Sequence, residues 1–473
     1  MNFRGVSSFM HKGARMNNRL ALEQRPATHG AGLAARAGAR LRQLLLAAGA
    51  LAGLGLMATP AHAVPAFARQ TGQDCIACHV GGFGPQLTPF GRAFKLGGYT
   101  LQGGSEKHHI PLSAMLVASY THTTDDNQSA PGFSSNDNFT ALQQASVFLA
   151  GRITDHIGMF GQATYSNPGD DRVMWDNTDI RYAHDYQFGS TTGIFGISLN
   201  NNPTVSDVWN TVPAWQFGFM SSPFGQGYGP AQPMIAGLGQ SVIGTTAYTL
   251  VDNHWYFEGG LYHGISNWWN QQLKGGGADA VYGYNPYWRI NYSTSSGLSN
   301  YEVGLIGMNT KVSDGVGTDT NEFKDYGVDA SYQYIDGGTN SVTVNGLYMR
   351  EKQDYAAEYV GNGSSNASNT LNFLNINTAY WYQNTYGATI QFFDTTGSSD
   401  AVLYSAGNNY SNNNPETSGV VWELDWNPFG KSWADPEKNL RLGLQYTTYN
   451  KFAGSSQGAS GNNSLYLYLW TAI

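Results

Sequence analysis

Residues 325–334 read DYGVDASYQY, and polar or small residues alternate in it with aromatic and aliphatic ones. On an extended strand, one face would carry Tyr326, Val328, Ala330, Tyr332 and Tyr334, and the other Asp325, Gly327, Asp329, Ser331 and Gln333. A period of two is typical of a β-strand whose two faces meet different surroundings. The stretch therefore predicts a strand with one apolar side and one polar side.

The same alternation recurs near the C-terminus. Trp422, Leu424 and Trp426 oppose Glu423 and Asp425; Leu440, Leu442, Leu444 and Tyr446 oppose Arg441, Gly443 and Gln445; and Leu465, Leu467 and Leu469 alternate with Tyr466, Tyr468 and Trp470. From Ile110 onward, clusters of Asn, Gly, Ser and Asp interrupt such segments every 15 to 25 residues. This spacing predicts a large, mainly β protein.

Composition helps to distinguish a helical membrane protein, a soluble β protein and a membrane β-barrel. The 473 residues include 59 glycines, 29 tyrosines and 12 tryptophans, and only 12% are charged. Beyond the N-terminal region no apolar run reaches about 20 residues, which excludes a helical membrane protein. A soluble β-sandwich would alternate too. Strands of 9 to 12 residues, aromatic residues near strand ends, and long polar loops at 125–139, 357–368 and 399–417 favour an antiparallel transmembrane β-barrel in the outer membrane, with lipid on one face.

About 17 segments qualify as strands, whereas bacterial barrels of this class have an even number. The weakest is 213–220, inside a Pro- and Gly-rich region from Pro203 to Gly239. We assign it to a long loop that can fold into the lumen as a constriction. The prediction is then a barrel of about 16 strands.

Residues 1–63 have the features of a secretory signal peptide. They are rich in Arg, contain an apolar run from Leu44 to Met57, and end in Ala61-His62-Ala63, a small-x-small cleavage site. Of 25 basic and 33 acidic residues, eight bases and one acid precede residue 64, which leaves 17 against 32. This acidic balance argues against nucleic acid as a partner and suits the attraction of cations.

The only two cysteines of the chain lie in Cys75-Ile76-Ala77-Cys78-His79. This spacing attaches a c-type haem through two thioether bonds, and the adjacent histidine ligates the iron. We therefore predict one covalent haem on Cys75 and Cys78 with His79 as proximal ligand. A local disulfide or a redox pair is the alternative. The predicted organisation is a signal peptide (1–63), a monohaem cytochrome c segment (64–107) and a barrel (108–473).

A short helix should follow the motif. Thr88 suits an N-cap, Pro89 suits the first helical position, and Gly97 with Gly98 suits the C-terminus. The segment is too small to bury a haem alone, so the barrel is its expected partner.

Four side chains on this helix are candidates for contact with the haem. Phe90 and Phe94 lie one turn apart, so they share a face that can pack against a porphyrin. Arg92 and Lys95 face elsewhere. They either neutralise haem propionates or are ordinary solvated charges.

The second axial ligand is left open by the sequence. No methionine lies between residues 64 and 107, so the candidates are His108, His109 and, on the first expected strand, Met115. Methionine in place of histidine would raise the reduction potential.

The run from Cys75 to His79, followed by Pro85, by residues 87–92 (LTPFGR), by residues 94–96 (FKL) and by Gly98-Tyr99, resembles the monohaem cytochrome-porin fusions of the bacterial outer membrane. That family oxidises extracellular Fe(II) in iron-oxidising bacteria. The resemblance implies that Fe(II) gives one electron to the haem, which passes it to a soluble periplasmic cytochrome. The chain departs from the family at Gln86, where an acidic residue is common, and in the glycines that lengthen the link after His79.

Two classes of function follow. The first is an electron conduit, an Fe(II)-oxidising cytochrome or a relay for another extracellular donor. The second is a transport porin whose haem segment is a plug or redox gate.

Overall fold

The computed structural model describes residues 66–82, 84–103, 111–126, 133–168, 172–205, 207–209, 217–266, 268–269, 280–313, 319–430 and 439–472. The predicted signal peptide, and His108 and His109, lie outside these residues. No helix in the described ranges is both long enough and apolar enough to cross a membrane.

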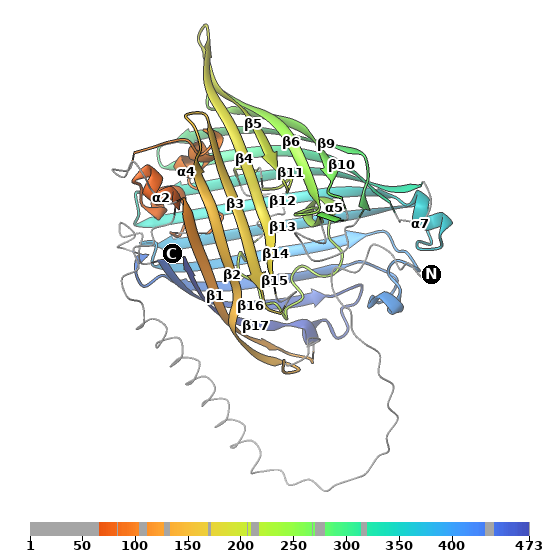
Figure 1. Ribbon diagram of the computed structural model, residues 1–473. Helices are drawn as coiled ribbons and strands as arrows, with labels where there is room; N and C mark the ends of the chain where they lie inside the picture. Colours follow the sequence, from red (N-terminus) through yellow and green to blue (C-terminus); the bar gives the residue numbers. More distant parts are fainter. Residues whose placement is uncertain are drawn as a thin grey trace, which may run out of the picture. The chain divides into compact units, whose positions relative to one another are not determined.

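One antiparallel sheet contains all the strands and closes on itself (Figure 1). The strands are β1 (Leu112–Thr123), β2 (Asp137–Arg152), β3 (Ile157–Ser166), β4 (Val173–Phe188), β5 (Thr191–Asn200), β6 (Val242–Val251), β7 (Trp255–Gly264), β8 (Ala280–Val281), β9 (Tyr284–Ser296), β10 (Ser299–Ser313), β11 (Thr320–Ile335), β12 (Asn340–Asp354), β13 (Ser368–Tyr382), β14 (Tyr386–Gly397), β15 (Thr417–Trp426), β16 (Asn439–Lys451) and β17 (Ser464–Ala472). Closure is made by β1 and β17, which pair from Met115 opposite Ala472 to Thr123 opposite Ser464.

The barrel has 16 strand positions, as predicted. The two residues of β8 pair with β10, and β9 pairs with the same strand further along, so the two segments occupy one position. In the predicted loop segment 213–220, residues 217–220 are irregular and form no strand, and 213–216 lie outside the described residues.

The alternation seen in the sequence separates the two surfaces of the barrel. On β11 Tyr326 and Val328 are exposed on the outside, whereas Asp325 and Asp329 are buried inside. Trp422, Leu424 and Trp426 of β15 are exposed, and Glu423 and Asp425 are buried. An apolar outer face around a closed sheet is the construction of a transmembrane barrel, because every backbone hydrogen bond is satisfied without water.

Several strands are longer than the predicted 9 to 12 residues. β2, β4 and β11 each have 16 residues, and β10, β12 and β13 each have 15. About 9 to 11 tilted residues cross a bilayer. The longer strands therefore continue beyond the hydrocarbon layer, and alternation within their polar ends was too weak to reveal their full length.

The two ends of the barrel differ in their connections. At one end, here called the turn end, neighbouring strands are joined by a few residues, such as 189–190, 252–254 and 297–298. Asp252 and Asn253 adopt the left-handed backbone that tight hairpins require, with φ of 50° and 59°. At the opposite loop end the connections are long, and the predicted loops correspond to 124–136, 355–367 and 398–416.

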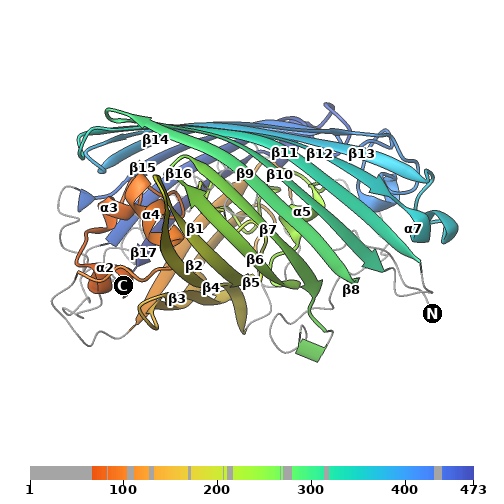
Figure 2. The ribbon, with the colours of Figure 1, turned by 90° about the horizontal axis from the view of Figure 1, so that it is seen from above.

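Short helices complete the structure. They are α2 (Ala66–Thr71), α3 (Cys75–Cys78), α4 (Pro89–Leu96), α5 (Met234–Gly237), α7 (Ala356–Val360) and the 3-10 turns η2 (Ala406–Asn408) and η4 (Ala459–Asn462). Figure 2 shows α2, α3 and α4 gathered near the C-terminus at the turn end, with α7 at the loop end and α5 between. Residues 66–103 are called the plug below.

The connection between β5 and β6, residues 201–241, is called the lumen loop below, and its described parts run along the inner wall. Its Ser222 hydroxyl is 2.8 Å from that of Thr121 on β1, and Gln445 on β16 donates to the Met220 carbonyl. Further along, the Ile235 N–H donates to Asp325 on β11. These contacts reach strands far from β5 and β6, which confirms the prediction of a loop folded into the lumen.

At the loop end, one carboxylate ties two of the long connections together. Asp400 is 1% exposed and accepts hydrogen bonds from Ser364, Ser365 and the backbone N–H of Leu403. Burial alone would raise the pKa of Asp400, but hydrogen bonds from Ser364, Asn369 and backbone N–H groups outweigh it and hold the pKa below its usual range.

Replacing Asp400 with Asn should loosen this tie. The amide loses the charge that strengthens the bonds, so we expect proteinase K to cleave the loops 355–367 and 398–416 about tenfold faster at neutral pH. The exposed Asp319→Asn is the matched control. Because the folded-state pKa is depressed, the stabilisation is present above pH ~3.8 and is lost as the pH falls through the lower folded value. Equal cleavage of Asp400→Asn and the native protein at neutral pH would contradict the role of Asp400 in holding the two loops together.

Candidate functional site

The Cys75–His79 motif lies in the plug, against the inner wall at the turn end. Cys75 begins α3 and is buried in a cluster with Met115 of β1, Met220 of the lumen loop, and inward-facing aromatic residues of β17. Its Sγ is 3.8 Å from Asn439 Oδ1. Cys75 therefore packs against the part of the wall where the first and last strands of the barrel pair.

Both cysteines are free thiols in this environment. Burial raises the pKa of Cys75 to about 12 and that of Cys78 to about 11, so both stay protonated at neutral pH. A redox-active cysteine pair works through a thiolate with a lowered pKa. Burial therefore works against a thiolate at either sulfur, and haem attachment, like a local disulfide or a redox pair, stays a prediction.

His79 follows directly. Its backbone forms a bridge with Leu87, and the Val80 N–H donates to the Gln86 carbonyl at 3.0 Å, so a short hairpin orients the imidazole. The Nδ1 atom is buried and has no hydrogen-bond partner among the described residues. Burial lowers the pKa of His79 to about 4. The imidazole is neutral, which is the protonation state in which histidine ligates a metal, so these residues fit the group.

The hairpin is fastened to the barrel wall at Gly81. Its carbonyl accepts from Asn427 Nδ2 at 2.7 Å and from Arg441 Nη2 at 2.8 Å. The Arg441 guanidinium lies 4.7 Å from the ring centroid of Trp381 and 5.5 Å from that of Trp470. Gly81 has φ of +71°, and a Cβ there would overlap the Trp381 ring, so glycine is required.

The helix predicted after the motif is α4. Thr88 accepts from the Gly91 N–H at 3.2 Å, Pro89 begins the helix, and Gly97 follows its end. On the next segment, the Tyr99 hydroxyl donates to Asp179 on β4 at 2.7 Å.

The two basic residues of α4 bind the inside of the barrel. Arg92 donates to Gln333 Oε1 on β11 at 2.7 Å, and Lys95 donates to the carbonyls of Val205 and Asp207 in the lumen loop. The solvated-charge interpretation is wrong for Lys95, which is 9% exposed. Sequence reasoning missed this role because the wall residues that face the helix are distant in the chain.

The two phenylalanines of α4 occupy different surroundings. Phe94 is buried and packs on Phe67 and Tyr99, with ring centroids 5.0 Å and 5.8 Å away. Phe90 is 39% exposed. Phe94 thus holds α2 and α4 together, and Phe90 keeps a ring face open. Their packing against haem stays a prediction.

Among the candidates for the second ligand, Met115 faces the lumen and shares the cluster of Cys75. Met220 of the lumen loop belongs to the same cluster. Sequence reasoning missed Met220, because no local pattern shows which wall the loop follows.

Charged side chains line the inner wall, and many are compensated there. Arg289 of β9 is fully buried and lies 2.8 Å from Asp329 and 3.2 Å from Asp207. Such pairs keep charge inside a barrel whose lumen is occupied by the plug and the loop. Within the described ranges, no group of three or more His, Cys, Asp or Glu side chains is arranged to hold a metal ion.

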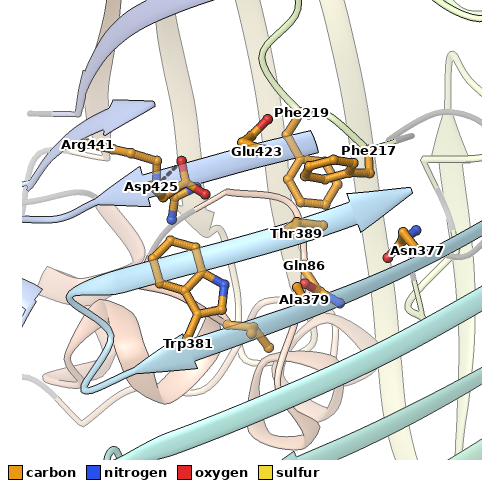
Figure 3. A pocket seen from close by; sticks show the side chains of 11 residues that line it. Gln86, Phe217, Phe219, Asn377, Ala379, Trp381, Thr389, Glu423, Asp425 and Arg441 are labelled. Carbon is orange, nitrogen blue, oxygen red and sulfur yellow. Dashed lines mark ion pairs between the residues drawn. The ribbon is translucent and has the colours of Figure 1, made fainter. Parts of the chain in front are cut away.

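A small cavity opens beside the motif, between the plug, the lumen loop and the wall formed by β13 to β16 (Figure 3). It is lined by Val80, Gln86, Phe217, Phe219, Asn377, Ala379, Trp381, Thr389, Glu423, Asp425 and Arg441. Two plug residues, Val80 and Gln86, thus line the same cavity as the wall carboxylates Glu423 and Asp425. Apart from Arg441, the other lining side chains are neutral.

No protein-family model and no curated protein matches the chain. Among solved structures, OmpF of Salmonella typhi in complex with daunomycin is similar, with 14% identity over 76% of this chain and 97% of that chain and a TM-score of 0.44. The outer membrane channel DcaP of Acinetobacter baumannii has 12% identity over 76% and 96%, with a TM-score of 0.43. An anion-selective porin from Comamonas acidovorans has 9% identity over 76% and 98%, with a TM-score of 0.42. Similarity at this level leaves the function to be argued from the chain's own residues.

Proposed function

We propose that this chain is an outer-membrane electron-transfer protein that takes electrons from extracellular Fe(II) and passes them to a soluble periplasmic cytochrome. One observation carries the proposal. The only two cysteines of the chain and the histidine that follows them lie together in the plug, inside a closed barrel, where they are free thiols beside a neutral imidazole.

A c-type haem, when bound, supplies a centre that accepts and releases one electron. Cys75 and Cys78 would attach it and His79 would ligate its iron. Met115 and Met220, both in the cluster of Cys75, are candidates for a second ligand, as are His108 and His109, which lie outside the described residues. Arg441 and Asn427 fix the Gly81 carbonyl and so hold the hairpin that carries His79. The stoichiometry is simple: each Fe(II) loses one electron to become Fe(III), and the periplasmic carrier gains that electron.

The architecture supports a direction of transfer. Outer-membrane barrels carry short turns on the periplasmic side and long loops outside. By this rule the plug, which lies at the turn end, meets the periplasm, where a soluble carrier can dock. The acidic mature chain, 17 bases against 32 acids, favours the approach of a cation.

Reduction by the donor tests the proposal. Purified, haem-loaded protein should show a reduced-minus-oxidised difference spectrum after addition of Fe(II) at the pH of the host. His79→Ala should change the spectrum of the haem, because the proximal ligand is lost. A haem protein whose spectrum never changes with Fe(II) would remove the iron assignment and leave a conduit for another donor. A preparation without haem would remove the electron-transfer function altogether.

A plugged transport porin is the second candidate, because the closed barrel with an internal loop could conduct once the plug moves. Channel conductance separates the two functions, as argued in the Discussion.

A further inference from the structure

The outer surface of the barrel carries basic side chains at the loop end of β11 and β12, which are neighbours in the sheet. On β11 the outward-facing residues from Tyr326 to Tyr334 are aromatic, aliphatic or small. A band of this length matches the roughly 9 to 11 tilted residues that cross a bilayer. The next outward-facing residue toward the loop end is Lys324. Lys324 therefore lies at the border between the hydrocarbon layer and the lipid headgroups.

Cross-strand pairing places two more bases beside Lys324. Lys352 of β12 lies directly opposite Lys324, and Arg350 lies opposite Tyr326, one row nearer the hydrocarbon. Residues two apart on a strand share a face, so these side chains all point outward, and Arg350 and Lys352 are exposed. Lys324, Arg350 and Lys352 are called the basic rim patch below. The residues of the same two rows on β10 and β13 are uncharged: Gly307, Asn309, Thr370 and Asn372.

The acidic residues near the basic rim patch lie one row further from the hydrocarbon. Glu322 and Asp354 face each other there. Glu322 lies 2.7 Å from the Lys324 ammonium, and Asp354 lies 3.3 Å from that of Lys324 and 3.0 Å from that of Lys352. Ion pairs that are open to solvent contribute little, so another anion can compete for these lysines. The acids therefore occupy the side of the patch that faces away from the membrane.

Positive charge remains after these pairs are counted. Lys311 of β10 lies opposite Glu322, which brings the group to four bases and two acids. Arg350 forms no ion pair with any residue that the structure describes. Lys324 and Lys352 are directly opposite each other, and like charges in that arrangement destabilise a sheet. This excess is positive although the mature chain has 17 bases against 32 acids. An anion in the headgroup layer would compensate it.

We propose that the basic rim patch binds the phosphate groups of a phosphorylated glycolipid in the outer leaflet of the membrane. Outer-membrane barrels keep their long loops outside, so the loop end meets that leaflet. Lysine and arginine at this depth bind lipid phosphates through charge and hydrogen bonds. Tyr326 and Tyr348, which are 52% and 44% exposed, lie next to the patch on the hydrocarbon side and can contact the lipid chains. This apolar neighbour favours a lipid over a free phosphate ion. The inference goes beyond electron transfer and does not depend on it.

Lipid A is the probe, and native mass spectrometry of the full-length mature protein in detergent counts the lipids bound to each barrel. We expect the native protein to retain lipid A. The triple variant Lys324→Gln, Arg350→Gln and Lys352→Gln should bind it roughly a hundredfold more weakly, because three bases at the membrane surface are lost. Dephosphorylated lipid A should bind the native protein equally weakly. Lys451→Gln, which removes an exposed, paired lysine at the loop end of β16, is the matched control and should bind like the native protein.

Three results would overturn the proposal. These are equal binding of lipid A by the triple variant and the native protein, equal binding of the dephosphorylated lipid, and displacement of lipid A by an equal concentration of inorganic phosphate. The last would indicate a phosphate site without a lipid partner.

A single variant keeps the test valid if the triple variant does not assemble. Arg350→Gln removes no ion pair with a described residue, so the barrel should fold, and binding of lipid A should fall about fivefold. The migration of folded and heated samples on gels reports assembly of each variant. Haem content and reduction by Fe(II) do not enter the measurement, so failure of this site leaves the proposed function standing, and the reverse also holds.

Discussion

Replacing Cys75 and Cys78 together with serine is expected to remove all covalently bound haem from the protein. Serine hydroxyls do not form the thioether bonds that link a c-type haem, and the chain has no other cysteine. Haem-dependent peroxidase staining on denaturing gels should fall from a clear band to background. The pyridine haemochrome spectrum of the native protein should show the two-thioether form, and each single variant should retain at most one bond.

A matched control separates attachment from folding. Ala77→Ser changes the same turn of α3 without touching either sulfur, so it should stain like the native protein. The migration of folded and heated samples on gels reports whether each barrel has assembled. Equal staining of the double-serine variant and the native protein would show that the motif does not attach haem.

Deleting the plug, residues 66–103, is expected to open the barrel. The native protein should conduct poorly in planar bilayers, because plug residues occupy the turn end, bind the wall through Arg92 and Gly81, and bind the lumen loop through Lys95. Without them the inward-facing polar residues line a wide, water-filled passage, narrowed only by the lumen loop. We expect conductance to rise at least tenfold.

A point variant tests the same idea without a deletion. Arg441→Ala removes a hydrogen bond to Gly81 and the contacts with two tryptophan rings, so brief openings should appear against a closed background. Gly81 itself keeps only its bond from Asn427 in that variant. Large, steady conductance by the intact native protein would instead favour the transport porin.

Much of the fold could be predicted from the sequence, because its causes are local. In a barrel wall each residue faces either lipid or lumen. The alternation at residues 325–334 therefore depends on the surroundings of a single strand, and it can be recognised in the sequence without knowing which strands pair with it. The same holds for α4, whose limits depend on Thr88, Pro89 and Gly97 alone. The even strand number also predicted that the 213–220 segment adds no strand, and residues 217–220, its described part, are irregular.

Other features depend on residues that are distant in the chain. Lys95 has the pattern of a solvated helix residue, and only the lumen loop that folds over it turns it into a buried donor. Met220 and Cys75 share a cluster because the loop crosses to the wall formed by β1 and β17. Neither contact produces a recognisable local sequence pattern, because residues that bond or pack across the lumen have no fixed spacing in the sequence.

The Cys75–His79 motif shows where the two kinds of information meet. The sequence by itself determined which reactive groups the motif contains: two thiols and an imidazole, at the spacing that attaches one porphyrin. It also indicated the number of strands in the surrounding barrel. Only the tertiary structure decided that these groups lie at the turn end, with Cys75 buried, Cys78 and His79 half-buried, and the imidazole neutral. It also placed Gln86 of the plug beside Glu423 and Asp425 of the wall. The physical reason is that burial and charge compensation depend on which distant segments exclude water from a group, and closure of the barrel around the plug settles that.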